Sequence, residues 1–300
     1  PTMNLGQIIV VLSTAPIDRG LSNTLGNLAT NLGLSLRPFD SQGCVVIGNT
    51  HAQRWQVSRE LAPTEREAFR KLASSLSLDL AFLAPGFKPA RLRILAMDMD
   101  STLINIECID EIADFAGKKA EVAAITEATM RGEIANFSES LRRRVALLQG
   151  VSESVLEAVY RERLIPNPGA TQLLTAANAA GLHTLLVSGG FTFFTQRMQR
   201  DLGFAETHAN TLEIQDGKLT GAVLGDIVDA SGKATHVKNA CKALGCKKTA
   251  AITIGDGAND LLMMDGSGLS IAYRAKPIVK EKADAAFDRV GLDATLALIA

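Results

Sequence analysis

Ile94-Leu-Ala-Met-Asp-Met-Asp-Ser-Thr-Leu103 is the stretch that decides how the rest of this 300-residue chain is interpreted. Its apolar first half predicts a buried strand, and Asp98 and Asp100 follow where that strand ends. Neighbours i and i+2 of a strand point the same way, so the two carboxylates are expected on one side. They repel each other unless a cation lies between them or one holds a proton. The alternative is a solvated acidic loop, because acidic residues are usually exposed.

The composition is that of an ordinary globular protein, 47% apolar and 21% charged, and the length allows two domains. A formal net charge of −1 gives no electrostatic reason to expect a nucleic acid or an anionic membrane as a partner. Only 5% of the residues are aromatic, which also disfavours a base-stacking surface. We therefore expect small-molecule chemistry.

The cysteines and the apolar runs indicate a cytoplasmic protein. The four cysteines are scattered without the two-residue spacing of a zinc or redox motif, so we expect them to be reduced and mostly structural. The apolar run from Ile8 to Leu12 is too short for a signal peptide and follows no basic segment. No window approaches the roughly 18 apolar residues of a membrane span.

Residues 1–84 are predicted to form a small α+β domain with the order β-α-β-β-α-β, which is typical of a ferredoxin-like sandwich. Residues 85–92, rich in proline and glycine, read as a linker. No catalytic cluster is evident before it, so a regulatory, dimerising or vestigial role remains open. The predicted strands are Ile8–Leu12, Cys44–Ile47, Arg54–Val57 and Leu78–Leu83, and the predicted helices are Ser22–Leu32, with Ser22 as its cap, and Pro63–Leu72.

Residues 93–300 are predicted to form a parallel-sheet, Rossmann-like core with helices on both faces, because strand and helix signals alternate along the chain. A helical block at about 105–165 interrupts this alternation directly after the first strand, which predicts an inserted cap. Asp216-Gly217 marks a hairpin turn. The other predicted strands are His183–Val187, Ala250–Ile254 and, last, Leu269–Ala272, and the predicted helices include Phe191–Leu202 and Lys233–Leu244.

Three strands of this core end in polar or glycine-rich turns. These turns are Asp98–Asp100, Ser188–Gly190 and Gly255–Asp256. Sites in open parallel sheets lie at the carboxyl ends of the strands. We therefore expect the three turns to meet in one crevice under the cap.

The expected crevice has the chemistry of phosphoryl transfer. Asp98, Asp100 and Asp256 offer the oxygen ligands that Mg²⁺ prefers, and no histidine beside these turns favours zinc. Ser188, the adjacent glycine amides and Lys233 suit phosphate oxygens. Catalysis of phosphoryl transfer is mainly positioning and charge neutralisation, and an aspartate can itself be the nucleophile.

The order of Asp98-Met-Asp-Ser-Thr102, Ser188-Gly-Gly190, Lys233 and Gly255-Asp-Gly-Ala-Asn-Asp260 resembles the haloacid-dehalogenase-like phosphatases. Three further stretches make residues 93 to about 290 similar to the phosphoserine phosphatase family, and the first domain resembles the ACT-like domain of longer members. These stretches are Glu107-Cys-Ile-Asp-Glu-Ile-Ala113, Ser140-Leu-Arg-Arg-Arg-Val145 and Val187-Ser-Gly-Gly-Phe191.

The resemblance implies Mg²⁺-dependent hydrolysis of O-phosphoserine to serine and phosphate through an aspartyl-phosphate, the last step of serine biosynthesis. It makes Asp98 the nucleophile and Asp100 the general acid and later base. It implies that Asp98, the Asp100 carbonyl and Asp256 bind Mg²⁺. It further implies that Ser188, Gly189 and Lys233 bind the phosphate and that Asn259 completes the pocket. Glu107 is then expected to recognise the ammonium of the substrate, and Arg144 its carboxylate.

Helical periodicity tests the choice of Arg144. On a helix from Asn136 to Gln149, four apolar residues form one stripe at about 100° per residue. Arg143 then points away from this stripe and Arg142 to its side, so both are expected in solvent, whereas Arg144 lies at the edge of the stripe. The stripe consists of Phe137, Leu141, Val145 and Leu148.

Other interpretations remain open for several residues. Glu107 falls away from the apolar side of its helix and has the alternative of a first-turn acid that favours the helix dipole. Ser188 has the alternative of an ordinary helix cap, and Lys233 that of a surface lysine. Asp260 has the alternative of a partner to metal ligands rather than a ligand itself.

Rival functions remain open as well. They are hydrolysis of another small phosphomonoester, phosphate transfer to an alcohol, and a non-enzymatic amino-acid sensor. A homodimer is compatible with each of them.

Overall fold

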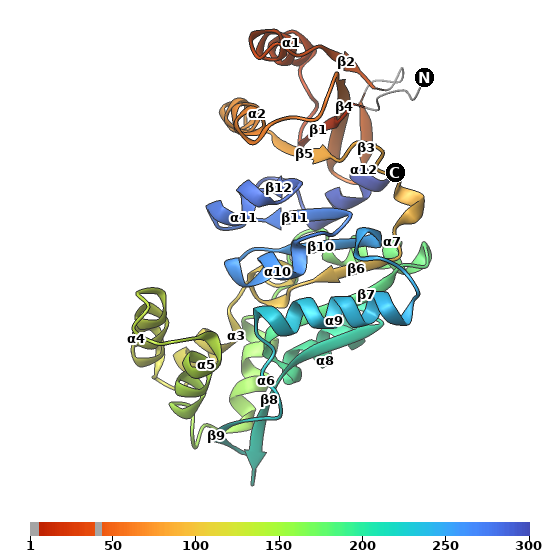
Figure 1. Cartoon of the computed structure of the whole chain (residues 1–300). Coiled ribbons are helices and arrows are strands. Elements are labelled where there is room, and N and C mark those ends of the chain that lie inside the picture. Colours follow the sequence, from red (N-terminus) through yellow and green to blue (C-terminus); the bar gives the residue numbers. More distant parts are fainter. Residues whose placement is uncertain (1–5, 40–43) are drawn as a thin grey trace.

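The computed structural model describes residues 6–39 and 44–300, and their strands form one continuous sheet (Figure 1). The strand order is β2-β4-β1-β5-β12-β11-β10-β6-β7-β8-β9, and β3 pairs with β4. The strands are β1 (Ile8–Ser13), β2 (Leu36–Pro38), β3 (Val45–Ile47), β4 (Thr50–Val57), β5 (Asp79–Leu83), β6 (Ile94–Met97), β7 (His183–Phe191), β8 (Glu206–Gln215), β9 (Lys218–Leu224), β10 (Ala251–Gly255), β11 (Leu269–Tyr273) and β12 (Ala285–Phe287).

Helices cover both faces of this sheet, and four of them form a separate lobe beside it (Figure 1). The helices are α1 (Leu21–Asn31), α2 (Pro63–Ser75), α3 (Cys108–Phe115), α4 (Lys119–Met130), α5 (Phe137–Ala146), α6 (Glu153–Glu162), α7 (Ala170–Ala179), α8 (Thr192–Leu202), α9 (Ala230–Ala243), α10 (Leu261–Met264), α11 (Pro277–Lys282) and α12 (Thr295–Ile299). In the described ranges, no helix is long and apolar enough to cross a membrane.

The amino-terminal unit is an antiparallel sheet with α1 and α2 packed on one face. Buried and less buried residues alternate along β4, as expected for a strand with one face on a core. This unit contains one strand more than predicted. The sequence gives no clear signal for β2, because this strand is only three residues long and ends in proline. The residue that precedes α1 is Gly20, so the prediction that Ser22 caps this helix is wrong. The similarity of this unit to ACT-like domains stays a prediction.

The larger unit has the predicted parallel core. Strands β12, β11, β10, β6, β7 and β8 run parallel, and β8 returns into β9 through Asp216 and Gly217, whose φ angles are 52° and 73°. Positive φ at both positions is typical of a tight hairpin turn. The prediction that Leu269–Ala272 is the last strand is wrong, because β12 follows. A three-residue strand leaves too short a pattern to identify in advance.

A direct strand pairing joins the two units. β5 pairs antiparallel with β12, and the buried Asp79 carboxylate of the first unit accepts three backbone N–H bonds from the second. The donors are Asp288, Arg289 and Val290, at 3.1, 2.8 and 2.9 Å. The segment 85–92, predicted as a linker, thus connects strands of the same sheet. The division into domains at residues 1–84 and 93–300 stays a prediction.

The lobe beside the sheet consists of α3 to α6, inserted between β6 and β7 (Figure 1). Its helices end near Gly117, Gly132 and Gly150, where φ is 68°, 76° and 83°. Glycine tolerates this left-handed backbone, which explains why the helical pattern breaks there. The lobe lies where the sequence predicts a cap.

Candidate active site

The turn that follows β6 holds Asp98 and Asp100. The strand ends at Met97, and Asp98 accepts a hydrogen bond from the Met99 N–H at 2.7 Å. The chain then kinks, and Ser101 has a positive φ of 58°. The spacing predicted that Asp98 and Asp100 share one side as neighbours of a strand. That prediction is wrong, because both residues lie beyond the end of β6. The kink, rather than strand alternation, brings both carboxylates to the same cavity.

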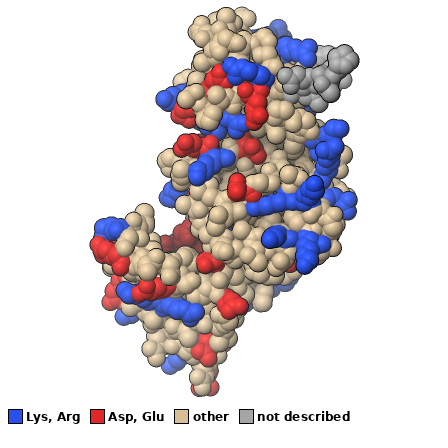
Figure 2. All heavy atoms as spheres, viewed as in Figure 1, with Lys and Arg blue, Asp and Glu red and all other residues tan. Residues whose placement is uncertain are grey.

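This cavity has a volume of about 230 Å³ and lies between the sheet and the cap. It collects all three predicted strand ends, so the predicted convergence is confirmed. In Figure 2, acidic side chains are visible deep in the recess between the cap and the core. The cavity is lined by Asp98, Asp100, Glu107, Ile109, Phe137, Leu141, Arg144, Ser188, Gly189, Gly190, Phe191, Lys233, Asp256, Gly257, Asn259 and Lys276.

Lys233 on α9 is a buried cation rather than a surface lysine, with only 1% of its surface exposed. Its Nζ lies 3.0 Å from Asp98 Oδ1 and 2.9 Å from Asp260 Oδ1. Burial alone lowers the pKa of Lys233, but the two carboxylates outweigh that effect and raise this pKa above its ordinary value. The ammonium is therefore fixed in its charged form at the floor of the cavity.

Asp260 shapes the loop that follows β10. Its Oδ2 accepts the backbone N–H groups of Asp256 at 3.0 Å and Gly257 at 3.1 Å, while Oδ1 accepts Lys233. A side chain at Gly255 would put its Cβ 2.5 Å from the Asp260 carboxyl group, so this close approach requires glycine. These bonds occupy both oxygens of Asp260. The observation favours Asp260 as a partner that positions ligands.

The acidic cluster fits a divalent cation with oxygen ligands. Carboxylate oxygens of Asp98, Asp256 and Asp260 all lie within 4.8 Å of one another. Asp98 and Asp256 use only Oδ1 in hydrogen bonds with described residues, and Asp100 Oδ1 is buried without any partner among them. Burial raises the pKa of Asp256 to about 6. A cation would relieve the repulsion between these carboxylates and bind the oxygens that lack a hydrogen-bond partner.

The two aspartates of the turn have different surroundings. Burial raises the pKa of Asp98, as does the neighbouring Asp260 carboxylate, whereas Lys233 lowers it. Among the described residues, no ammonium forms an ion pair with Asp100, and its Oδ2 accepts the Cys108 N–H at 3.2 Å. Burial, together with the charge of Glu107, raises the pKa of Asp100 to about 8. Asp100 therefore holds a proton near neutral pH, which suits a general acid.

The Ser188 turn lines the cavity beside the aspartate turn, because β7 pairs with β6. Ser188 is fully buried within β7, and its Oγ accepts the Gly190 N–H at 2.8 Å. The residue that caps α8 is Phe191, so Ser188 is not an ordinary helix cap. A Cβ on Gly189 would lie 3.0 Å from Cζ of Phe137 in the cap, which shows how closely the cap approaches the turn.

Two charged residues of the cap face the cavity. Glu107 precedes α3 and accepts a hydrogen bond from the Ser101 hydroxyl, so it is tied to the aspartate turn. Arg144 is half-buried, and none of the described residues forms an ion pair with it; its Nε donates to the Ser140 carbonyl at 3.3 Å. Burial lowers the pKa of Arg144, and nearby Asp110 and Glu107 offset part of this effect. The guanidinium is therefore available to a ligand carboxylate.

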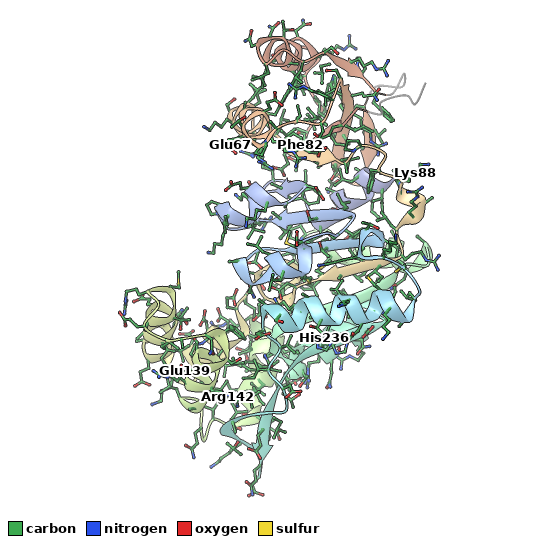
Figure 3. All side chains as sticks on the ribbon, viewed as in Figure 1. Glu67, Phe82, Lys88, Glu139, Arg142 and His236 are labelled. Carbon is green, nitrogen blue, oxygen red and sulfur yellow. The ribbon has the colours of Figure 1, made fainter. Side chains whose placement is uncertain are left out.

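The helical stripe places the neighbouring arginines as predicted. Leu141, Val145 and Leu148 are buried, while Arg142 and Arg143 are exposed. Figure 3 shows Arg142 on α5 in the cap lobe. The predicted solvated positions of these two arginines are confirmed.

Three contributors to the site were not identified from the sequence: Thr102, Phe137 and Lys276. Thr102 donates its hydroxyl to Asp256 Oδ1 at 2.7 Å, and the Lys276 N–H donates to the Asp256 carbonyl at 2.9 Å. Phe137 and Lys276 line the cavity. Thr102 lies within residues 94–103, but no contact with Asp256 was predicted for it. Phe137 was assigned to the apolar stripe, and Lys276 follows β11 with no local signal of a site.

Comparisons with known proteins agree with this geometry. A model of the haloacid dehalogenase-like hydrolases matches residues 95–265. The phosphoserine phosphatase of Polaromonas sp. is 55% identical over 219 residues, which are 72% of this chain and 93% of that protein. A crystal structure of a haloacid dehalogenase family hydrolase from Salmonella enterica has a TM-score of 0.84 at 32% identity and covers 98% of both chains. A probable phosphoserine phosphatase from Vibrio cholerae has a TM-score of 0.80 at 34% identity, covering 97% of this chain and 86% of its own. The chain belongs to the haloacid dehalogenase-like hydrolase family.

Proposed function

We propose that this protein is a Mg²⁺-dependent phosphatase that hydrolyses O-phosphoserine to serine and phosphate, which would make it the last enzyme of serine biosynthesis. The observation that carries the proposal is the composition of one small cavity. Asp98 and Lys233 lie on its floor, and Glu107 and Arg144 on its cap side. A phosphate group, an ammonium and a carboxylate therefore each have a partner of opposite charge. The names of the relatives support this substrate.

Asp98 is the proposed nucleophile. Its side chain lies at the end of β6, and its Oδ2 takes no part in the hydrogen bonds of the described residues. In the proposed first step, this oxygen attacks phosphorus and the bond to the serine oxygen breaks. The phosphoryl group is then held as an aspartyl-phosphate.

Asp100 is the proposed general acid and base. Its raised pKa of about 8 means that it carries a proton to donate to the leaving serine oxygen. In the second step the resulting carboxylate accepts a proton from the water that attacks the aspartyl-phosphate. Phosphate leaves, Asp98 is regenerated, and Asp100 has recovered its proton.

Asp98, the Asp100 backbone carbonyl and Asp256 are the proposed ligands of Mg²⁺. Bound there, the ion would neutralise charge on the phosphate oxygens and favour ionised Asp98. Asp260 and Thr102 hold Asp256 in position through its backbone N–H and its Oδ1. Because both oxygens of Asp260 already accept hydrogen bonds, we assign it to positioning.

Lys233, Ser188 and Gly189 are proposed to bind the phosphate oxygens, and Asn259 to complete the pocket. Lys233 supplies a fixed charge, while Ser188 and the backbone at Gly189 supply short-range donors from the end of β7. These groups are positioned before a substrate arrives. Such preorganisation is the main source of catalysis in phosphoryl transfer.

Glu107 and Arg144 are proposed to select the amino-acid part of the substrate. Arg144 lacks an ion pair among the described side chains and sits half-buried at the cavity, so a carboxylate would gain a charged hydrogen bond there. Glu107 offers its carboxylate to the ammonium. Phosphate esters without these two groups would lose both contacts.

None of residues 6–39 and 44–84 of the amino-terminal unit lines the cavity. The Polaromonas relative supports a separate role for that unit, because 72% of this chain suffices to match 93% of that protein. We propose that residues 1–84 form an ACT-like domain that serves regulation or the assembly of a homodimer, and that residues 93–300 carry the chemistry.

A panel of substrates, each assayed with and without Mg²⁺, tests the proposal. The panel comprises O-phosphoserine, O-phosphothreonine, phosphoethanolamine and sugar phosphates. We expect Mg²⁺-dependent phosphate release with the highest kcat/KM for O-phosphoserine. A preference for another ester would refute the roles of Glu107 and Arg144, product phosphorylated on an added alcohol would indicate a phosphotransferase, and no turnover at all would indicate a sensor.

A further inference from the structure

The carboxyl end of α9 places two cysteines on one tight turn. The helix ends at Ala243, and Gly245 adopts a positive φ of 64°. The Cys246 N–H donates to the Cys241 carbonyl at 2.9 Å, and the Gly245 N–H donates to the Lys242 carbonyl at 3.2 Å. This pair of bonds defines a Schellman motif, in which the two residues joined by the outer bond usually bring their side chains into contact. Here both of those residues carry thiols.

The two thiols differ in exposure. Cys241 is 4% exposed and belongs to the core between α9 and the sheet, whereas Cys246 is partly exposed and packs against the same core. Burial raises the pKa of Cys241 to about 11, and the adjacent Cys246 thiol contributes to the shift. Cys246 is therefore the thiol that a reagent in solvent meets first, and Cys241 is the neighbour behind it.

We propose that Cys241 and Cys246 form a redox-modification site that a peroxide converts into an intrachain disulfide. The Cys246 thiol loses its proton, and the thiolate attacks a peroxide oxygen. The O–O bond breaks to give a sulfenic acid and hydroxide, which takes up that proton and leaves as water. The Cys241 sulfur then attacks the sulfenic sulfur, the S–S bond forms and a second water leaves. Two thiols lose two electrons and two protons, and one hydrogen peroxide is reduced to two waters.

The modification site lies away from the catalytic cavity. Lys233 is near the start of α9 and Cys241 in its last turn, about 12 Å further along the axis at 1.5 Å per residue. Figure 1 shows α9 lying alongside the strands of the core, with one end toward the cap and the other end away from it. A disulfide here would fix the turn between α9 and β10 without touching Asp98 or Lys233. We expect phosphate release to be unchanged by its formation.

Peroxide titration of the full chain, followed by thiol alkylation and peptide mass spectrometry, tests the proposal. We expect a linked Cys241–Cys246 peptide lighter by two hydrogens than the reduced pair, while the buried Cys108 remains available for alkylation after denaturation. Recovery of both Cys241 and Cys246 as alkylated thiols while Cys44 is oxidised would overturn the proposal, as would a disulfide that links Cys241 or Cys246 to another chain.

Three variants identify the order of events. In Cys241→Ser, Cys246 should accumulate as a sulfenic acid that dimedone traps, and Cys246→Ser should leave Cys241 as an unmodified thiol. Cys44→Ser is the matched control and should form the disulfide normally. If Cys241→Ser fails to fold, Cys246→Ser alone decides, because trapping of a sulfenic acid on Cys241 in that variant would contradict the order. Loss of turnover in the oxidised wild-type chain would contradict the remote placement of the site.

Discussion

Replacing Lys233 by methionine removes the only described cation that separates two buried carboxylates. Asp98 and Asp260 are 5% and 0% exposed, and each lies within 3.0 Å of the Lys233 ammonium. Methionine fills a similar volume but supplies no charge and no donor. The variant therefore keeps the packing of α9 and leaves two acidic groups facing each other in a site with little water.

The size of the effect follows from burial. Removal of one partner from a buried ion pair costs about 3–5 kcal/mol, which lowers Tm by on the order of 10 °C in a chain of this size. Lys233 lowers the pKa of Asp98, so its removal raises the pKa of that carboxyl group further in the folded variant. A carboxyl group with a raised folded pKa loses its stabilising contribution as pH increases. The stability deficit of Lys233→Met is therefore expected to be larger at about pH 8 than at about pH 5.

Thermal and urea unfolding followed by circular dichroism measure this prediction, with Lys238→Met as the matched control. Lys238 is exposed on the same helix, so its replacement is expected to change stability by no more than about 0.5 kcal/mol. The double variant Lys233→Met/Asp260→Asn should recover part of the lost stability but no turnover. If Lys233→Met has the same Tm and the same urea midpoint as Lys238→Met, the interpretation of Lys233 as a paired buried cation is wrong.

Three further changes test other parts of the site. Arg144→Gln should lower kcat/KM for O-phosphoserine roughly 10- to 100-fold, through loss of a charged hydrogen bond, and leave phosphoethanolamine, which has no carboxylate, unchanged; equal losses for both would contradict its role. Gly255→Ala, with its Cβ 2.5 Å from the Asp260 carboxyl group, should destabilise the protein by about 1–3 kcal/mol and reduce turnover, whereas Gly26→Ala, with open space around it in α1, should not. Because burial raises the pKa of Asp256 to about 6, Mg²⁺ must displace a proton below that pH. The affinity for Mg²⁺, measured by calorimetry, should therefore fall as pH decreases through about 6. In the metal-free protein, the stability contribution of Asp256 should instead fall as pH rises through the same range. An Mg²⁺ affinity independent of pH would argue against Asp256 as a ligand.

The larger unit and its site were predictable because their signals are local. Apolar runs that end in Asp98, Ser188 and Gly255 indicate strands, and the rule that parallel strands place their sites at one edge converts three sequence motifs into one cavity. The cap was predictable for a similar reason, because helix-breaking glycines leave a pattern in the sequence. Arg144 could be separated from its neighbours because a helix has a fixed angular period.

The features that were missed depend on contacts between distant residues or on special backbone geometry. The pairing of β5 with β12 joins residues about two hundred positions apart, and β12 is too short to show a pattern. The turn after Met97 depends on a positive φ at Ser101, which no propensity of serine predicts. Lys276 reaches the cavity only because β11 lies beside β10. Such contacts are created by the fold and are absent from local sequence.

Chemical trapping of the phosphoryl group tests the central claim most directly. The protein is mixed with Mg²⁺ and O-phosphoserine, quenched in acid within the first turnover, digested, and analysed by mass spectrometry. The proposed mechanism predicts one phosphoryl group on Asp98, absent after the Asp98→Asn substitution, which should also abolish phosphate release. Release of phosphate at an undiminished rate by Asp98→Asn, or a phosphoryl group on a different residue, would contradict it.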